Sequence, residues 1–235
     1  MSGKESTPGQ VLQWNLSQEI IKMKDIAIYG AGGFGREVAC LINIINQQEK
    51  IWNFIGFFDD GKVIGNENEY GKILGGIKEL NDWQKPLSIA IAIGSPNIIQ
   101  TIVSKINNSN INYPNIIAPD TKWLDQANTS MGKGNIICSN CWISCNVYIG
   151  NFNIFNGSIT IGHDANIGNY NALMPAVRIS GEVIIGEKNF FGVSSIVLQQ
   201  IKIGNNIVLG ANSVLIRKPK DNSTYVGNPA TIIKY

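Results

Sequence analysis

The sequence predicts a chain of two units: an α/β unit in the first half and a coil of very short parallel strands in the second. Two observations predict this. Strand-like and helix-like segments alternate from residue 24 to about residue 118, and from Met131 onward an apolar residue recurs at every sixth position. Residues 1–22 read as a polar arm, either native or an artificial extension, because "MKDIAIYG" at Met23 reads as a second natural start.

The composition is that of a globular protein with a hydrophobic core. Of 235 residues, 44% are hydrophobic and 15% are charged, and the formal net charge of +2 argues against a dedicated binder of polyanions. No apolar run approaches the roughly 18 residues of a membrane span, and the first 22 residues lack the order of a signal peptide. Free thiols without an export signal lead us to expect a cytoplasmic protein.

The first unit begins with "DIAIYGAGGFGREVACLINII", which predicts a strand at residues 26–29, a glycine turn and a helix. The helix carries four apolar residues on one side, namely Val38, Leu41, Ile42 and Ile45. "FIGFFDD" predicts a second strand, and "LSIAIAIGSPNIIQTIVSKI" predicts a third strand, a turn and a helix. Strands that alternate with helices predict a small parallel, Rossmann-like sheet over residues 23–118.

The glycine turn is a candidate phosphate site. Gly30, Gly32 and Gly35 form G-x-G-x-x-G between a strand and a helix, so backbone N–H groups and a helix N-terminus can face an anion. Asp59 and Asp60 follow the second strand, where they could hold a ribose or a base edge. NAD is the habitual interpretation of this motif, and a tight turn without ligand is the plain alternative.

The second unit, expected over residues 119–235, has a period of six residues. A period of six fits neither a helix nor a long strand, but it fits short strands joined by tight turns into a three-sided prism. Three hexads make one 18-residue coil, so about five coils at about 4.8 Å each give a prism about 24 Å long. The fifteen periodic positions are all apolar: Met131, Ile137, Ile143, Ile149, Phe155, Ile161, Ile167, Leu173, Ile179, Ile185, Phe191, Val197, Ile203, Leu209 and Leu215.

Three of the four cysteines lie in "CSNCWISC", at Cys138, Cys141 and Cys145, while Cys40 lies on the first helix. A closed metal site needs four ligands, and neither a histidine nor a fourth thiol is near this run. We therefore expect the cysteines to pack in the interior and expect no metal.

These features together resemble the bacterial hexapeptide-repeat sugar acyltransferases. The motifs that carry the resemblance are "IYGAGGFGREVA", "GFFDD", "AIGSP", the hexads, "NGSITIGHD" and "VGNPATII". The most similar group contains two-domain enzymes that acetylate the amine of nucleotide-linked amino sugars, or a hydroxyl of sialic acid. The resemblance implies a left-handed parallel β-helix, a homotrimer with active sites between subunits, and acetyl-CoA as the donor.

The resemblance also implies roles for particular residues. His163, the only histidine, matches the general base, and Asp164 matches the acidic residue that follows it. Asn156 matches an asparagine near the acceptor, although it could instead be a stacking asparagine like those at 153, 171 and 189. The remaining matches are Gly30, Gly32, Gly33 and Gly35 near the phosphates, Asp59 and Asp60 near the nucleoside, and Gly181, Gly192, Gly210 and Ala211 along the pantetheine arm of acetyl-CoA.

Three positions depart from the pattern of some relatives. Gly162 stands where they carry an acid before the base, Ala172 where they carry a second histidine, and Phe34 where the glycine turn contains a histidine. These departures leave the base intact but leave the identity of the sugar open.

Imidazole suits acetyl transfer because it titrates near neutrality and can accept a proton from an attacking amine or hydroxyl. The sequence therefore favours acetyl-CoA-dependent N-acetylation of a nucleotide-linked amino sugar, with O-acetylation of a sugar or sialic acid as the alternative. An NAD-binding oxidoreductase and a non-catalytic trimeric scaffold are further alternatives. A metal hydratase on such a prism would need about three histidines, and the chain has one.

Overall fold

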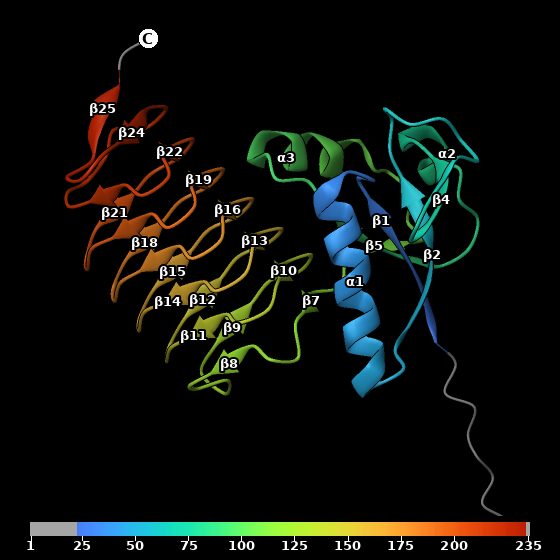
Figure 1. The fold of residues 1–235 in the computed structure, drawn as a ribbon, viewed down its shortest axis with the longest axis horizontal. Helices are drawn as coiled ribbons and strands as arrows, with labels where there is room; N and C mark the ends of the chain where they lie inside the picture. Colours follow the sequence, from blue (N-terminus) through green and yellow to red (C-terminus); the bar gives the residue numbers. More distant parts are fainter. Residues whose placement is uncertain (1–22, 234–235) are drawn as a thin grey trace, which may run out of the picture.

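The computed structural model describes residues 23–233, so the predicted polar arm at residues 1–22 lies outside the described part of the chain. An α/β unit and a β-helix lie side by side (Figure 1). Both units of the predicted fold are confirmed. None of the helices within residues 23–233 has the length and apolar character needed to cross a membrane.

The α/β unit is a six-stranded sheet in the order β3-β4-β2-β1-β5-β6. Its strands are β1 (Lys24–Tyr29), β2 (Trp52–Phe58), β3 (Glu67–Asn68), β4 (Gly71–Gly75), β5 (Leu87–Ile91) and β6 (Ile111–Asn112), and its helices are α1 (Gly33–Gln48), α2 (Ile77–Asn81) and α3 (Pro96–Lys105). β1 pairs in parallel with both β2 and β5, so the strand before the glycine turn is central. The four apolar residues predicted on one side of α1 are all buried.

The second unit is a prism of three sheets in which the strands from β9 to β23 pair in parallel at a spacing of 18 residues. The spacing is 20 residues for β7 with β10 and for β8 with β11, and β24 and β25 pair antiparallel at the end of the prism. The domain-facing sheet contains β7 (Ile116–Ile117), β10 (Ile136–Ile137), β13 (Ile154–Phe155), β16 (Ala172–Leu173), β19 (Phe190–Phe191), β22 (Val208–Leu209), β24 (Thr224–Val226) and β25 (Thr231–Ile233). The second sheet contains β8 (Lys122–Trp123), β11 (Trp142–Ile143), β14 (Thr160–Ile161), β17 (Arg178–Ile179), β20 (Ile196–Val197) and β23 (Val214–Leu215). The third sheet contains β9 (Ser130–Met131), β12 (Tyr148–Ile149), β15 (Asn166–Ile167), β18 (Ile184–Ile185) and β21 (Lys202–Ile203).

The six-residue period of the sequence corresponds to the side chains that fill the core of this prism. Every predicted periodic residue except Met131 is buried, and Met131 packs against the same core. The glycines that follow these residues lie where successive coils nearly touch. A Cβ at Gly168, for example, would lie 2.4 Å from the carbonyl oxygen of Gly186. The fifteen predicted hexads are the strands β9 to β23, which make the predicted five coils, while β7 and β8 extend the prism toward its amino-terminal end, and the helix is left-handed.

A row of buried asparagines ties neighbouring coils together along one edge of the prism. The row consists of Asn135, Asn153, Asn171 and Asn189, each at most 1% exposed. The backbone N–H of Asn153 donates to Oδ1 of Asn135 at 2.8 Å, and the Asn153 side chain donates to the Gly168 carbonyl at 2.9 Å. Since buried amides must be paired, this row satisfies the buried asparagine side chains between neighbouring coils.

The α/β unit packs directly on the first coils of the domain-facing sheet, and the start of α3 faces β19 and β22 across a cavity of about 350 Å³. The outward side chains of Ile136, Ile154 and Ala172 are buried, whereas Val208, further along the same sheet, is 38% exposed. The second and third sheets carry no part of the α/β unit. Consequently the turns between these two sheets form the corner of the prism opposite the α/β unit.

Candidate functional site

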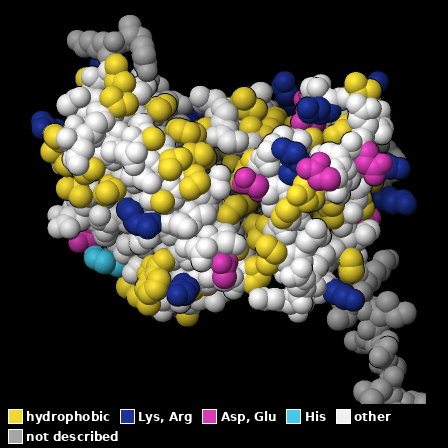
Figure 2. Space-filling view, in the orientation of Figure 1, with side chains coloured by type: hydrophobic (Ala, Val, Ile, Leu, Met, Phe, Trp, Pro, Cys, Tyr) yellow, Lys and Arg dark blue, Asp and Glu magenta, His cyan; other side chains and the backbone are white. Residues whose placement is uncertain are grey.

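His163 lies in the turn between β14 and β15, at the corner opposite the α/β unit. We call this edge the His163 corner; it comprises the stacked turns at residues 145–146, 163–164, 181–182 and 199–200. The single histidine is the cyan side chain at the margin of the β-helix in Figure 2, away from the α/β unit. The ring is about half exposed, at 55% of its side-chain area, so a substrate can reach it.

The carboxylate of Asp164 holds the imidazole. Oδ2 of Asp164 lies 2.7 Å from Nδ1 of His163, and the Asp164 carboxylate also accepts a hydrogen bond from the side chain of Asn146, one coil earlier. The hydrogen bond from Asn146, and then the one from His163, hold the pKa of Asp164 below its ordinary range. Asp164 is therefore ionised at neutral pH, which favours a proton on Nδ1 and leaves Nε2 as the free base.

The His163 ring lies over the backbone of Gly181, one coil further along. A Cβ built on Gly181 would lie 2.5 Å from Nε2 and 2.7 Å from Cε1 of the ring, so only glycine leaves room for this position. The N–H of Gly181 makes no hydrogen bond within residues 23–233. A free backbone donor thus lies near the base, where a developing oxyanion needs one.

Two of the sequence departures have structural reasons. A Cβ at Gly162 would lie 2.5 Å from the backbone nitrogen of Gly181, so the acid that some relatives carry before the base cannot fit here. Ala172 is fully buried in the domain-facing sheet beside the α/β unit, which separates that position from His163.

Asn156 lies on another edge, which we call the Asn156 corner: the turns between the domain-facing and second sheets, at residues 138–140, 156–158, 174–176, 192–194 and 210–212. It does not belong to the buried asparagine row, which excludes the stacking alternative. With Glu37 and Cys40 of α1 it lines a cavity of about 370 Å³ between α1 and the prism.

The predicted donor-binding residues fall on both corners. Gly192 and Gly210 lie 36 and 54 residues after Asn156 on the Asn156 corner, and Ala211 is next to Gly210. The backbone hydrogen bonds from Asn156 to Leu173 and from Gly192 to Leu209 show this stacking. Gly181 belongs to the His163 corner. A strand of the second sheet separates the two corners, so in one chain the residues predicted to bind acceptor and donor do not all meet His163.

The four glycines of the turn divide into two pairs. Gly30 adopts φ +106° against Ala92, and a Cβ at Gly35 would lie 1.9 Å from the carbonyl oxygen of Gly30, so both are needed for packing. Around Gly32 and Gly33 nothing lies within 4 Å of a built Cβ. This open pair lines a cavity of about 380 Å³ at the carboxyl ends of β1 and β5, with the N-terminus of α1 beside it.

Asp59 and Asp60 line the same cavity, but both carboxylates already accept hydrogen bonds from neighbouring groups of the protein. The Asp59 carboxylate accepts the N–H groups of Ala31 at 2.8 Å and Gly61 at 2.9 Å. Asp60 accepts the hydroxyl of Tyr29 at 2.6 Å and the N–H of Ile77 at 2.8 Å. Burial and the hydrogen bond to Asp60 raise the pKa of Tyr29, which stays protonated as a donor. The sequence did not single out Tyr29 or Asn146.

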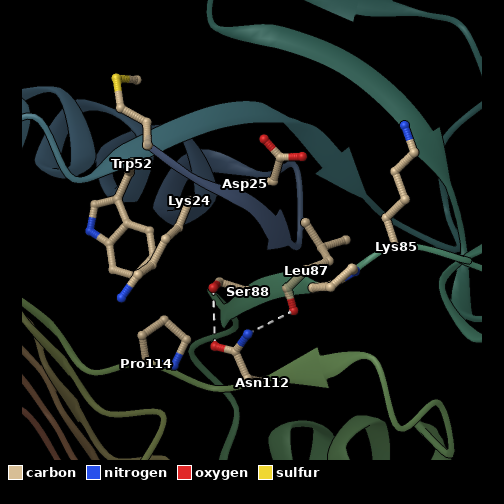
Figure 3. Close-up of a pocket in the computed structure, with 10 residues that line it drawn as sticks. Lys24, Asp25, Trp52, Lys85, Leu87, Ser88, Asn112 and Pro114 are labelled. Atoms are coloured by element: carbon tan, nitrogen blue, oxygen red, sulfur yellow. Dashed lines mark hydrogen bonds between the residues drawn. The ribbon is translucent and has the colours of Figure 1, made fainter. Parts of the chain in front are cut away.

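A cavity of about 650 Å³ lies at the opposite end of the sheet (Figure 3). It opens at the amino ends of β1 and β5, beside Lys24, Trp52 and Lys85, and the side chains of Ser88 and Asn112 bond each other at 3.0 Å across it. Ligands of parallel α/β sheets bind at the carboxyl ends of the strands, so we assign the candidate site to the glycine turn instead.

Of the four cysteines, Cys141 is buried in the core of the prism and Cys138 is partly buried against the core of the α/β unit, whereas Cys40 and Cys145 are of intermediate exposure. Burial raises the pKa of Cys138 to about 12 and that of Cys141 to about 11, which keeps both thiols protonated and unreactive. Among residues 23–233 no three histidine, cysteine or acidic side chains gather as metal ligands would.

Comparison with known proteins supports this architecture. Residues 25–106 match the family of the PglD N-terminal domain. The acetyltransferase domain of PglB from Neisseria gonorrhoeae superposes with a TM-score of 0.81 at 24% identity, over 89% of this chain and 100% of that one. That domain has also been solved with acetyl-CoA. No curated protein sequence matches the chain significantly.

Two further structures have the same two-unit fold. The perosamine N-acetyltransferase PerB from Caulobacter crescentus, solved with CoA and GDP-perosamine, has a TM-score of 0.79 at 22% identity, over 91% of this chain and 99% of that one. WeeI from Acinetobacter baumannii has a TM-score of 0.78 at 25% identity, over 90% and 100%. The resemblance seen in the sequence is confirmed.

Proposed function

We propose that the protein transfers the acetyl group of acetyl-CoA to the amine of a nucleotide-linked amino sugar, with His163 as the general base. The observation that carries the proposal is the His163 imidazole, fixed at Nδ1 by an ionised Asp164 and placed over the open backbone of Gly181. Support comes from the similar folds of PglB, solved with acetyl-CoA, and of PerB, solved with CoA and GDP-perosamine.

This geometry is suited to attack on a thioester. The sugar nitrogen attacks the thioester carbon, and Nε2 of His163 accepts a proton from that nitrogen. Asp164 stabilises the imidazolium that forms, and the N–H of Gly181 is positioned to stabilise the oxyanion. When the intermediate collapses, the carbon–sulfur bond breaks, and the departing CoA thiolate takes the proton back from the imidazolium.

The acceptor proposal assigns the nucleotide to the glycine turn. Gly32 and Gly33 present open backbone at the N-terminus of α1, which suits the diphosphate of a nucleotide sugar. The carboxylate oxygens of Asp59 already accept two backbone N–H groups, which weakens the comparison with the free acid that binds ribose in NAD enzymes. Binding of a nucleotide sugar therefore gives a function to both units of the chain, whereas NAD binding would give no function to the prism.

We further propose that the active sites form between subunits of a homotrimer. His163 lies on the corner opposite the domain-facing sheet, so it cannot face the glycine turn of its own chain. If the His163 corner of one copy meets the Asn156 corner of the next, Asn156, Gly192 and Gly210 come to the base. Three-fold symmetry repeats this heterologous contact and closes it.

The central experiment measures release of CoA thiol from acetyl-CoA with a panel of nucleotide-linked amino sugars, and with free sialic acid as the acceptor for O-acetylation. We expect turnover with an amino sugar and a decrease of about 10²- to 10⁴-fold in His163→Asn, the usual range for loss of a general base. Unchanged thermal unfolding shows that the variant is folded. Wild-type turnover in His163→Asn would refute the role of His163, and turnover with sialic acid alone would favour O-acetylation.

Mixed trimers test whether the site crosses between subunits. Gly33→Glu places a carboxylate in the open space beside the proposed diphosphate, and it is combined with His163→Asn on separate chains. We expect each variant alone to have at most about 1% of wild-type activity. In trimers assembled at random from equal amounts, about one quarter of the interfaces join an intact histidine to an intact turn, so about one quarter of wild-type activity returns. No recovery would place both groups of a site on one chain.

A further inference from the structure

The cavity at the amino end of the α/β sheet is lined by residues that the proposed function does not use. Its volume of about 650 Å³ lies within the range of roughly 300–1,000 Å³ for small-molecule sites. β1 has six residues, so at about 3.3 Å each the cavity lies about 20 Å from the glycine turn at the other end of that strand. No helix N-terminus takes part, so any ligand here is recognised by side chains alone.

Four of the lining residues come from adjacent strands and share one face of the sheet. Trp52, Lys24, Ser88 and Asn112 lie on β2, β1, β5 and β6, which is their order in the sheet. In the strand register, Lys24 pairs with Trp52 and Ser88 pairs with Asn112. Ser88 also pairs with Ile26, which is two residues after Lys24 and therefore on the same face.

The cation of this face is available to a ligand. Lys24 forms none of the ion pairs found within residues 23–233. Asp25 points to the other face because side chains alternate along a strand, and its carboxylate accepts a hydrogen bond from Asn53 at 2.7 Å. Figure 3 shows Lys24 beside Trp52, and Asp25 turned the other way, on the side of Lys85. An anion beside Lys24 is therefore not opposed by the Asp25 carboxylate.

The floor of the cavity offers hydrogen bonds. Ser88 is 3% exposed, in a strand whose other residues are all apolar. Its hydroxyl donates to Oδ1 of Asn112 at 3.0 Å, and the Asn112 side chain donates to the Leu87 carbonyl at 3.3 Å. The Ser88 oxygen keeps its capacity to accept, and the second N–H of the Asn112 amide has no partner in the described chain. The pair thus has both a donor and an acceptor for a polar group of a ligand.

The walls beside these polar groups are apolar and fixed. Trp52 is 8% exposed, and its backbone N–H donates to Oδ1 of Asn46 at 3.0 Å. Pro114 lines the cavity from the segment that leads into the prism. Rigid apolar walls favour a flat ligand, because neither partner loses much conformational freedom on binding.

We infer that this cavity binds a small aromatic carboxylic acid with a hydroxyl group at the far end of its ring. The carboxylate pairs with Lys24. The ring packs against Trp52 and Pro114, and the hydroxyl reaches the Ser88–Asn112 pair. The register places the Cα atoms of Lys24 and Ser88 about 8 Å apart, from one strand spacing across the sheet and two residues along it. One benzene ring with substituents at opposite ends matches that separation.

The test is an NMR titration of the full-length protein, followed at the indole N–H signal of Trp52, which Trp52→Phe identifies among the five tryptophans. The probe is 4-hydroxybenzoate; benzoate lacks its hydroxyl, and methyl 4-hydroxybenzoate lacks its charge. We expect saturable binding of 4-hydroxybenzoate with a Kd of about 1 mM, the range for a ligand of this size. Benzoate should bind about 5-fold more weakly and the methyl ester about 10-fold more weakly, because each loses one hydrogen bond to the site.

Variants assign each part of the ligand to its partner. Lys24→Gln should weaken 4-hydroxybenzoate about 10-fold and leave the methyl ester unchanged, and Lys24 is exposed, so folding persists. Ser88→Ala should weaken 4-hydroxybenzoate about 5-fold and leave benzoate unchanged. The matched control is Lys85→Gln, which removes a cation of the same cavity on the side of Asp25 and should bind as wild type does.

Three outcomes would show that the inference is wrong: no saturable shift of the Trp52 signal with 4-hydroxybenzoate, equal binding of the acid and its methyl ester, or equal weakening by Lys85→Gln and Lys24→Gln. Neither a sugar nor CoA takes part in the titration. The inference and the proposed acetyl transfer therefore stand or fall separately.

Discussion

The glycine turn and the His163 corner are two candidate sites built on different principles. The glycine turn is made where β1 meets α1 in one short stretch of sequence, and the same chain supplies the Asp59 carboxylate that holds the turn from 28 residues further along. The His163 corner is made by residues 18 apart, where Asn146, Asp164 and Gly181 meet because coils stack. A site built by a repeat extends along one edge of the prism, so one chain supplies only one side of such a site, and the proposed trimer would supply the other.

Glycine is required at the two sites for different reasons. In the turn, Gly35 is required because the helix nearly touches the strand, and in the prism, Gly181 is required because a functional ring lies over it. Substitution should therefore cost folding stability at Gly35 and activity at Gly181.

The largest effect is expected from Gly35→Ala. The added Cβ would lie 1.9 Å from the carbonyl oxygen of Gly30, a backbone atom that cannot move without shifting β1 or α1. We expect about 3 kcal/mol of destabilisation or more, at the upper end of the range for overpacking, measured by urea unfolding of the α/β unit. Gly33→Ala is the control, because its Cβ meets open space and alanine favours a helix. Equal stability of the two variants would contradict this division of the glycines.

The sequence predicted the parts of the fold that depend on period and on local motifs. The hexads gave both the coil number and the buried positions, and G-x-G-x-x-G gave the turn between β1 and α1. β3, β4, α2 and β6 were not predicted, because each has at most five residues and they lie among glycines and polar residues. Local patterns of that length do not separate strand from loop.

The site was predictable only in part, for a physical reason. His163 and Asp164 are adjacent in sequence, but Asn146 reaches Asp164 only through stacking, and an offset of 18 residues would have found it. Which face of the prism the α/β unit covers depends on side-chain packing between Ile136, Ile154 and the unit, and the periodicity is the same on all three faces. The separation of His163 from the glycine turn was therefore visible only in the structure.

Gly181→Ala tests whether glycine is required at the His163 corner for activity rather than for folding. Its Cβ would overlap Nε2 and Cε1 of His163, and the half-exposed ring can swing away, so folding should persist while the base loses its position. We expect kcat to fall about 10- to 100-fold with little change in the thermal midpoint, as misplacement of a catalytic group predicts. In a His163→Asn background the same substitution should have almost no further effect. A full additional loss there would mean that Gly181 acts independently of the ring.

The smallest effect is expected from Asn146→Ala, which leaves every atom of the His163 side chain and of the Asp164 carboxylate in place.

Asn146 is the main reason that the pKa of Asp164 lies below its ordinary range, and His163 is the second. A lowered pKa keeps the Asp164 carboxylate ionised down to more acidic pH. Removal of the Asn146 side chain should therefore raise this pKa, so that Asp164 takes up a proton at a higher pH. The acid side of the pH profile of kcat/KM should then move upward, while the rate at neutral pH changes by less than about threefold, because Asp164 is still ionised there. Asn206→Ala, which removes the side-chain bond to Asn222 on the third edge of the prism, is the matched control and should leave the profile unchanged. If the acid limb of the Asn146→Ala profile stays where it is in wild type, Asp164 orients the imidazole without help from Asn146 on the preceding coil. The His163 corner would then depend only on residues adjacent in sequence.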